Sequence, residues 1–204
     1  MTKKPDSERF AAILLAAGPS SRLGQPKQLA KVNGESLVRR SARLLMGMNP
    51  VSITVVIGFA GDAVKRELHD LPVRLVRNDD WEQGMGGSIA CGVNNIPEEV
   101  DGALVMLCDQ WRLEGYDLTR LISAWSSDIS RSSVASWYER KTLVYGPPAL
   151  FARSLFHELS NLSGSRGAKA VIGRQMEKVQ FVEMKNAAYD LDKPKDLEQL
   201  IKRC

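Results

Sequence analysis

Two cationic side chains, Arg22 and Lys27, stand five residues apart in a loop near the start of the sequence. The loop follows the apolar segment Phe10–Leu15 and contains Gly18 and a run of Pro and Ser. A Gly- and Ser-rich loop directly after a strand presents free backbone N–H groups, which bind phosphate oxygens. Arginine and lysine add the positive charge that a polyphosphate needs. The loop 18–27 is therefore predicted to hold a nucleoside triphosphate.

The elements that position this loop alternate between strand and helix along the first half of the chain. Apolar runs bounded by Gly, Pro and Ser are typical of buried strands, and repeated alternation with helices indicates a parallel sheet covered by helices. Ligands of open sheets bind outside the carboxyl ends of the strands. Three polar segments fall at those ends: 18–27, 78–88 and 109–110. The predicted strands span residues 10–15, 52–57, 73–77 and 103–108, and the predicted helices span 37–48, 62–68, the stretch from the 84–88 loop to 95, and 118–125.

The pattern changes in the second half of the chain. Two short strands, Ser132–Tyr138 and Lys141–Val144, predict a hairpin beside the parallel sheet, which Gly146-Pro147-Pro148 ends. Helices are expected near 154–159 and 168–174, then a strand at 179–183 and a terminal helix that begins at Pro194. The predicted fold class is α/β: a three-layer, Rossmann-like, mostly parallel sheet with helices on both faces and a small antiparallel element. We expect one domain over residues 1–204, with a flexible tail at 1–9.

The composition excludes several classes of protein. The 28 basic and 24 acidic residues are interspersed along the chain, whereas a nucleic-acid binder clusters its basic residues in a stripe with aromatics between them. No apolar run approaches the roughly 18 residues of a membrane span, and the polar start lacks the apolar core of a signal peptide. Three cysteines without a C-x-x-C pair argue against a disulfide framework or a zinc site. We expect a cytoplasmic protein without a nucleic-acid or membrane partner.

Two common phosphate-binding motifs can be tested directly against the loop. A P-loop requires G-x-x-x-x-G-K-[ST], but Gly18 and Gly24 are six residues apart and Gln25 follows Gly24. A dinucleotide fingerprint requires G-x-G-x-x-G at the start of a helix, and this spacing does not occur in the loop. The loop therefore belongs to another class of nucleotide site.

Further motifs follow the loop over nearly the whole chain. They are Leu15-Ala16-Ala17-Gly18, Ser21-Arg22-Leu23-Gly24-Gln25-Pro26-Lys27-Gln28, Asn78-x-Asp80-Trp81-x-x-Gly84-Met85-Gly86-x-Ser88, Asp109-Gln110, Gly146-x-Pro148-x-Leu150-Phe151, Gly164-x-Arg166-Gly167-Ala168 and Asp190-x-Asp192-x-Pro194-x-Asp196-Leu197. In this order they resemble the MobA-like nucleoside-triphosphate transferases, and most closely the molybdenum cofactor cytidylyltransferase branch. In the guanylyl branch the first loop resembles L-A-G-G, whereas this chain has Ala17 at the third position. Ala17 therefore favours CTP over GTP. The resemblance also implies the nucleotide-diphospho-sugar transferase fold.

The reaction implied by the resemblance joins CMP from CTP to the phosphate of molybdopterin. An acceptor phosphate oxygen attacks the α-phosphorus of the nucleotide, and pyrophosphate leaves. Such transfers need positioning and charge neutralisation more than covalent chemistry from the protein. Arg22 is expected to hold the β- and γ-phosphates and Lys27 to meet the charge that develops at the α-phosphate. Together with Asp109 they are the predicted catalytic residues.

The predicted cofactor is Mg²⁺, held by carboxylates. Asp109 follows a buried strand and offers the hard oxygen ligand that Mg²⁺ prefers. Asp192, or Asp190 beside it, would complete the site from the other side. Each has an alternative role as a helix cap, for which Asp is a favoured residue.

The binding residues are assigned to two groups. Asn78 and Asp80 have an alternative role as turn formers, and Arg166 has one as an exposed loop cation. The predicted nucleotide-binding residues are Leu15, Ala16, Ala17, Gly18, Ser20, Ser21, Arg22, Lys27, Asn78, Asp80, Gly84, Met85, Gly86 and Ser88, and the predicted residues for the second substrate are Gln110, Gly146, Pro148 and Arg166.

The sequence departs from the family pattern at three places, all on the side of the second substrate. Trp111 and Arg112 follow Asp109-Gln110 where the family usually has Pro, Ser165 replaces an acidic residue, and Pro147 stands where Asn is common. The acceptor therefore stays open. The alternatives are GTP or another small phosphorylated acceptor, and a non-catalytic protein that hands the cofactor to a molybdoenzyme or its chaperone.

Overall fold

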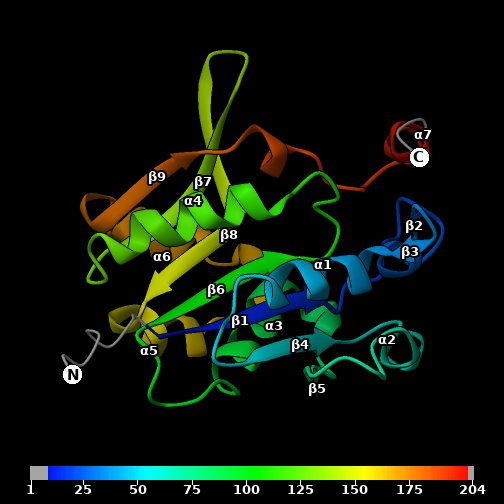
Figure 1. Ribbon diagram of the computed structural model, residues 1–204, viewed down its shortest axis with the longest axis horizontal. Coiled ribbons are helices and arrows are strands. Elements are labelled where there is room, and N and C mark those ends of the chain that lie inside the picture. Colours follow the sequence, from blue (N-terminus) through cyan, green and yellow to red (C-terminus); the bar gives the residue numbers. More distant parts are fainter. Residues whose placement is uncertain (1–8, 202–204) are drawn as a thin grey trace, which may run out of the picture.

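The computed structural model describes residues 9–201, without the side chains of Arg166 and residues 199–201 (Figure 1). Its centre is a seven-stranded sheet. The order across the sheet is β5 (Arg74–Arg77), β4 (Ile53–Ile57), β1 (Phe10–Ala16), β6 (Gly102–Leu107), β8 (Thr142–Ala152), β7 (Ser132–Glu139) and β9 (Val179–Glu183). Strands β5, β4, β1 and β6 run parallel, β8 is antiparallel to both of its neighbours, and β7 is parallel to β9. The predicted flexible tail lies, except for Arg9, outside the described residues.

Strand β1 shows why the sheet has helices on both faces. All seven of its residues are buried. Successive side chains point to opposite faces of a strand, and accordingly Leu14 packs into one core cluster while Ile13 and Leu15 pack into another. The first cluster includes residues of α1 (Leu37–Met46), α2 (Gly61–Glu67) and α4 (Gly115–Ser126). The second includes residues of α3 (Met85–Val93), α5 (Phe156–Ser160) and α6 (Lys169–Arg174), which confirms the predicted three-layer α/β fold.

A third, smaller cluster lies at the edge where the strands β1 and β6 end. Trp111 and Leu191 are buried in it, together with Ala30 and Leu37. Leu197 of the last helix, α7 (Pro194–Ile201), packs against it from the C-terminal side. The cluster thus fixes the position of α7 beside the loop that follows β1.

A small antiparallel hairpin, β2 (Lys31–Val32) and β3 (Glu35–Ser36), was not predicted. Asn33 and Gly34 connect the two strands with φ angles of 52° and 81°. A two-residue hairpin turn of type I′ requires positive φ at both positions, and Asn-Gly is a pair that adopts it readily. The Asn-Gly dipeptide was therefore the signal for this hairpin.

The predicted end of the longer hairpin is wrong. Strand β8 does not stop at Gly146-Pro147-Pro148 but continues to Ala152, and it lies within the main sheet between β6 and β7. Its register against β7 shifts between Val134 and Ala135, so that Ala135 pairs with Gly146 and Val134 with Ala149. The two prolines therefore have no partner on β7, which suits residues that lack an N–H donor.

The predicted loop at 84–88 is also corrected, because α3 already begins at Met85. Gly84 precedes the helix with φ 120°, a conformation that favours glycine. A Cβ on Gly86 would lie 2.7 Å from the carbonyl oxygen of Ser163. Close packing against a distant segment therefore overrides the low helix propensity of the glycines.

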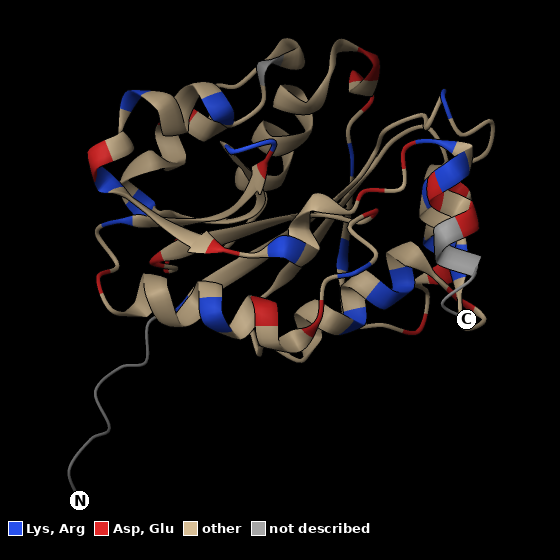
Figure 2. Ribbon diagram, turned by 90° about the horizontal axis from the view of Figure 1, so that it is seen from above, with Lys and Arg blue, Asp and Glu red and all other residues tan. Residues whose placement is uncertain are grey.

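The charged residues that face the viewer in Figure 2 are of both signs and are interspersed over the helices. Within residues 9–201, no helix combines the length and apolar character needed to cross a membrane.

Candidate active site

The loop after β1 is held by two polar side chains. The buried amide of Gln28 donates from Nε2 to the carbonyl oxygens of Ala16, at 3.0 Å, and of Gly18, at 2.7 Å. The backbone N–H of Lys27 donates to Oγ of Ser20 at 3.0 Å. Since Gln28 binds carbonyl groups of the loop, those groups are turned away from a phosphate. Gln28 had no predicted role, although its place directly after Lys27 was visible in the motif.

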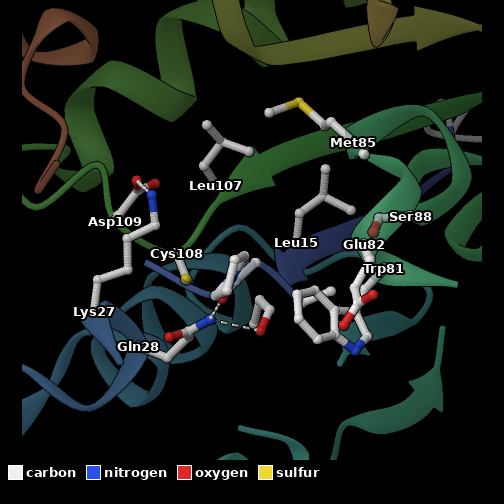
Figure 3. Close-up of a pocket in the computed structure, with 15 residues that line it drawn as sticks. Leu15, Lys27, Gln28, Trp81, Glu82, Met85, Ser88, Leu107, Cys108 and Asp109 are labelled. Atoms are coloured by element: carbon white, nitrogen blue, oxygen red, sulfur yellow. Dashed lines mark hydrogen bonds and ion pairs between the residues drawn. The ribbon is translucent and has the colours of Figure 1, made fainter. Parts of the chain in front are cut away.

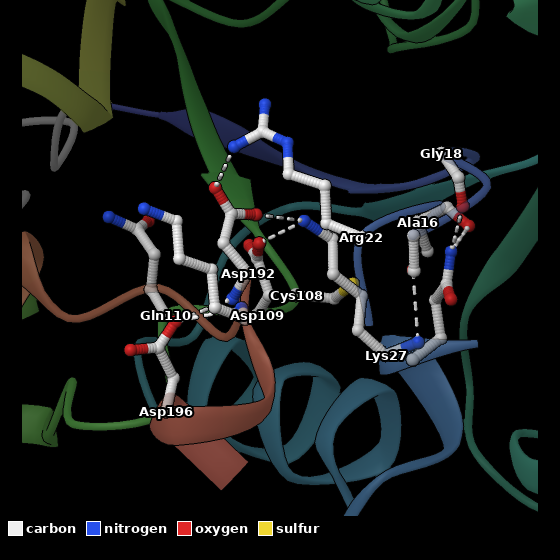
Figure 4. A network of polar contacts seen from close by, with 12 residues as sticks. Ala16, Gly18, Arg22, Lys27, Cys108, Asp109, Gln110, Asp192 and Asp196 are labelled. Atoms are coloured by element: carbon white, nitrogen blue, oxygen red, sulfur yellow. Dashed lines mark hydrogen bonds and ion pairs between the residues drawn. The ribbon is translucent and has the colours of Figure 1, made fainter. Parts of the chain in front are cut away.

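Four charged side chains meet beside this loop (Figure 4). The ammonium group of Lys27 bonds the carboxylate of Asp109 and lies 3.3 Å from Oδ1 of Asp192. Arg22 lies 3.6 Å from Oδ2 of Asp192. Asp109 comes from the end of β6 and is buried, whereas Asp192 precedes α7 and is half exposed. Two predicted catalytic cations and two predicted metal ligands thus converge in one network.

The network keeps Lys27 protonated. Burial alone lowers the pKa of a lysine. Here the carboxylate of Asp109 outweighs the burial, and the pKa of Lys27 lies above its ordinary value. The side chain is therefore a permanent cation at neutral pH.

Neither carboxylate serves as a helix cap. Helix α4 begins with a capping box formed by Glu114 and Asp117. The carboxylate of Asp196 accepts the backbone N–H groups of Asp192, at 3.2 Å, and Lys193, at 2.8 Å. Capping is thus done by other residues, and Asp109 and Asp192 are available for cations.

The two carboxylates fit a divalent metal that arrives with a phosphate ligand. Asp109 and Asp192 contact the same ammonium group, so a cation in its place would contact both. Mg²⁺ commonly uses one or two carboxylates together with phosphate oxygens and waters. Among the described residues, no group of three or more His, Cys, Asp or Glu is arranged to hold a metal by itself. Asp190 does not join the network; burial, together with the charges of Asp109 and Asp192, raises its pKa to about 7.

A cavity of about 540 Å³ begins at Lys27 and Asp109 and extends to Trp81 and Glu82 (Figure 3). It is large enough for a nucleoside. The rings of Trp81 and Phe59 meet edge to face with centroids 5.5 Å apart. Gly58 allows the indole of Trp81 to pack closely, since a Cβ there would lie 2.8 Å from that ring. A groove of about 170 Å³ continues from this cavity along the loop to Asp192.

Most of the predicted nucleotide-binding residues line these two spaces. The cavity is lined by Leu15, Ala16, Ala17, Gly18, Lys27, Gly84, Met85 and Ser88, and the groove by Gly18, Ser20, Ser21, Arg22 and Lys27. Asn78, Asp80 and Gly86 line neither. Asn78 donates from Nδ2 to Oγ of Ser88 at 3.0 Å and accepts the N–H of Asp80 at 3.2 Å. Its position is that of a turn former which orients Ser88.

A second cavity of about 340 Å³ adjoins the first, and the two share Leu15, Met85 and Leu107. Gln110 and Gly146 line it, as predicted for the second substrate, but at the diproline Pro147 lines it rather than Pro148. The side chain of Arg166 lies outside the described part of the structure, although its neighbours Ser165 and Gly167 line the cavity. Its apolar walls are formed by Ile89, Val105, Trp137, Tyr145, Phe151 and Ile172.

Gly84 and Gly86 pack closely against the backbone of residues 163–165, and we call this contact the glycine seam. A Cβ on Gly84 would lie 2.7 Å from the carbonyl oxygen of Gly164. The segment predicted to approach a nucleotide thus also approaches the backbone of the loop predicted to bind the second substrate. This contact joins the start of α3 to the residues 163–165.

Trp111 and Arg112, which differ from the family pattern after Asp109-Gln110, also have a structural role. The guanidinium of Arg112 lies 3.5 Å from the ring centroid of Tyr189 and 4.7 Å from that of Trp111. The backbone N–H of Leu191 donates to the carbonyl of Asp109 at 3.1 Å. The segment that carries Asp192 is thus held against the end of β6.

Comparisons with known proteins agree with this geometry. Nicotine blue oxidoreductase of Paenarthrobacter nicotinovorans is 28% identical over 93% of this chain and 95% of its own length. The crystal structure of Rv0371c from Mycobacterium tuberculosis H37Rv has a TM-score of 0.84 at 23% identity, over 96% of this chain and 98% of that one. Rv0371c in complex with manganese has a TM-score of 0.78 at 20% identity, over 96% of this chain and 100% of that one.

The structural likeness confirms the predicted fold of the nucleotide-diphospho-sugar transferase type. The model of one family matches residues 12–179. This range includes the loop after β1, Asp109 and the loops at 146–148 and 164–167 that are predicted to bind the second substrate. The chain therefore belongs to the family of the MobA-like NTP transferase domain.

Proposed function

We propose that this protein transfers a cytidylyl group from CTP to the phosphate of a molybdopterin-type acceptor and releases pyrophosphate. The observation that carries the proposal is the position of the charged network. Lys27 and Asp109 stand at one end of a cavity of nucleoside size, and a second cavity adjoins it through Leu15, Met85 and Leu107. A nucleotide and an acceptor bound side by side would meet next to these charges.

In the proposed reaction an oxygen of the acceptor phosphate forms a bond to the α-phosphorus. The bond from that phosphorus to the bridging oxygen of the β-phosphate breaks, and pyrophosphate carries away the electron pair. Lys27 neutralises the charge on the α-phosphate in the transition state, where such stabilisation lowers the barrier most. Arg22, on the exposed side of the groove, holds the leaving phosphates.

Asp109 and Asp192 would hold a divalent metal, which supplies Lewis-acid stabilisation to the phosphate oxygens when bound. The manganese complex of Rv0371c supports a divalent metal in this fold, and we propose Mg²⁺ as the physiological ion. When the nucleotide binds, Lys27 would exchange its carboxylate partners for phosphate oxygens of the nucleotide.

The choice of CTP rests on the resemblance at Ala17, a residue in the wall of the first cavity. GTP and other phosphorylated acceptors stay as alternatives, as does a carrier that hands the cofactor to a molybdoenzyme or its chaperone. A cytoplasmic location remains a prediction from the sequence. The name of the relative from Paenarthrobacter nicotinovorans denotes a redox reaction, so an oxidation–reduction assay belongs in the test.

The test is a pyrophosphate-release assay with CTP or GTP, with and without molybdopterin, in Mg²⁺ or Mn²⁺. We expect release with CTP only when molybdopterin is present. NAD(P)H consumption is followed in parallel with the same acceptor. Nucleotide binding without release under every condition would contradict an enzymatic function, and NAD(P)H consumption without release would favour the redox alternative.

Two lysine variants provide the matched control. Lys27→Met should lower kcat/KM by about a hundredfold, since one group that stabilises the transition state is typically worth this much. Lys65→Met removes an exposed lysine of α2, outside both cavities, and should leave the rate unchanged.

A further inference from the structure

The amide group of Gln28 uses both of its hydrogens inside the loop that follows β1. The side chain is fully buried, and Nε2 donates to the carbonyl oxygens of Ala16 and Gly18 (Figure 3). These contacts fix the orientation of the amide, because a flipped amide would place its oxygen against two carbonyl oxygens. Oε1 is left without a donor among the described residues. A buried oxygen without a donor is costly to the fold, so stability alone does not account for an amide at this position.

Gln28 also joins the two ends of the loop. It follows Lys27 in the short 3-10 helix Lys27–Leu29, whereas its acceptor Gly18 lies 10 residues earlier in the sequence. Gly18 and Lys27 both line the groove of about 170 Å³. The two hydrogen bonds of the amide therefore hold the start of the loop next to the residue that carries the ammonium group.

Other carbonyl groups of the loop also have donors within the protein. The carbonyl of Ala17 accepts the backbone N–H of Phe59 at 3.1 Å, and the carbonyl of Ser20 accepts that of Leu23 at 3.0 Å. An oxygen that faced the groove instead would repel a phosphate oxygen, because both atoms are acceptors. Internal donors thus occupy acceptor atoms that would otherwise oppose an anion.

The carbonyl of Gly18 depends on its donor more than the others do. It belongs to the peptide group before Pro19, which has no N–H. This peptide group therefore offers no donor to a phosphate in either orientation, and turned over it would present an acceptor. Gly18 is exposed, and a Cβ there would meet nothing within 4 Å, so packing does not hold it. The bond from Gln28, at 2.7 Å, fixes the direction of this carbonyl.

We propose that Gln28 is the positioning residue of the phosphate groove, which keeps the carbonyl oxygens of Ala16 and Gly18 out of the groove so that a triphosphate chain binds beside Lys27. Gln28 has no exposed surface and acts through the loop rather than by touching the substrate. The inference deepens the proposed function and rests on it for the assignment of the groove to the phosphates of the nucleotide.

Two variants at this position test the proposal, with inorganic triphosphate as the probe and calorimetry in the absence of metal. Gln28→Met has a side chain of similar length that donates no hydrogen bond, and it should weaken triphosphate binding at least about tenfold. Gln28→Glu places a carboxylate against two carbonyl oxygens and should weaken binding further. Gln175→Met is the matched control, because the amide of Gln175 donates to Glu158 at 3.0 Å and lines neither cavity nor the groove. Its affinity should stay within about twofold of the unmodified protein.

Melting temperature and circular dichroism show whether each variant keeps its fold. Triphosphate binding of unchanged affinity in the folded Gln28 variants would overturn the proposal, as would no binding by the unmodified protein at millimolar concentration. If neither variant folds, nuclear magnetic resonance of the unmodified protein decides. The side-chain amide protons of Gln28 should be protected from hydrogen exchange, and their signals should shift when triphosphate binds. Rapid exchange or unshifted signals would count against the proposal.

Steady-state kinetics separate this inference from the proposed function. Gln28→Met should raise the KM for CTP about tenfold and leave kcat within about threefold, since the loop binds phosphates in the ground state as well. If triphosphate binding depends on Gln28 but no pyrophosphate is released with any acceptor, the transfer reaction fails and the positioning role stands. If pyrophosphate is released and Gln28→Met changes neither KM nor triphosphate affinity, the transfer reaction stands and the inference fails.

Discussion

The charged groove at Lys27 and the second cavity differ in how their polar groups are paired. Lys27, Arg22, Asp109 and Asp192 at the groove are each other's partners. In the second cavity, no donor among the described residues lies within hydrogen-bonding distance of the Asp190 side chain, and the wall is mostly apolar. A ligand of the groove must therefore displace existing ion pairs, whereas a ligand of the second cavity contacts mostly apolar side chains. Exchange of charged partners is thus expected to govern binding in the groove, and apolar contact to govern binding in the second cavity.

The largest effect is expected from Asp109→Asn, which removes a charge from the groove and leaves the second cavity intact. Transfer should fall by about a thousandfold, because a metal held beside the reacting phosphate contributes several kcal/mol to transition-state stabilisation. Steady-state pyrophosphate release measures the loss. Pterin binding should be unchanged.

The control for this change is Asp62→Asn, an exposed aspartate in the first turn of α2. It should leave transfer within about twofold of the unmodified protein, as exposed substitutions away from the site have small effects. Near-normal turnover of Asp109→Asn would remove this carboxylate from the reaction.

The second effect concerns the stability of the paired charges. Lys27→Met leaves the buried Asp109 without its partner, and loss of one member of a buried pair costs about 3 kcal/mol. Asp192→Asn breaks half-exposed contacts and should change the free energy of unfolding by less than about 1 kcal/mol. Urea denaturation measures both values. Equal stabilities would show that the groove is not held together by its internal pairs.

A change at the glycine seam should weaken ligand binding in both cavities. Gly84→Ala places a Cβ 2.7 Å from the carbonyl oxygen of Gly164 at a φ of 120°, which should cost about 2 kcal/mol. Both CTP binding and pterin binding should weaken, as measured by calorimetry and fluorescence.

Gly173→Ala is the matched control, because a Cβ there meets nothing within 4 Å and the backbone is helical. It should stabilise the fold by up to about 1 kcal/mol. If Gly84→Ala weakened the binding of one substrate alone, the seam would not couple the two regions.

The smallest effect is expected on the discrimination between the nucleotide bases of CTP and GTP. Ala17→Gly removes one methyl group from the wall of the first cavity. One carbon in an apolar pocket changes discrimination by about tenfold at most for a partly open site, so the preference for CTP over GTP should fall by no more than this. Competition between the two nucleotides measures the ratio, and an unchanged ratio would show that base selection lies elsewhere.

The sequence was sufficient to predict the groove. Lys27 and Asp109 are 82 residues apart, yet both follow strands of one parallel sheet, and such strands end at a common edge. Local patterns identify the strands, and the topology rule then brings the two residues together. This is why the sequence was sufficient to predict that these charged side chains converge, while their role toward a phosphate stays a prediction.

The second cavity could not be predicted in the same way. The course of β8 through its two prolines depends on a register shift opposite Val134, which no local pattern contains. The different directions of Asp190 and Asp192 depend on a bridge to Gln110 and on the N–H of Leu191, contacts between distant segments. The glycines at 84 and 86 were predicted to approach a nucleotide, and the close neighbour that the structure shows is another part of the chain.

The ion pair between Lys27 and Asp192 spans 165 residues of sequence. During synthesis on the ribosome, the loop and β1 emerge first, Asp109 follows, and Asp192 is added last. A nascent chain therefore holds the complete charged network only after residue 192 has been made.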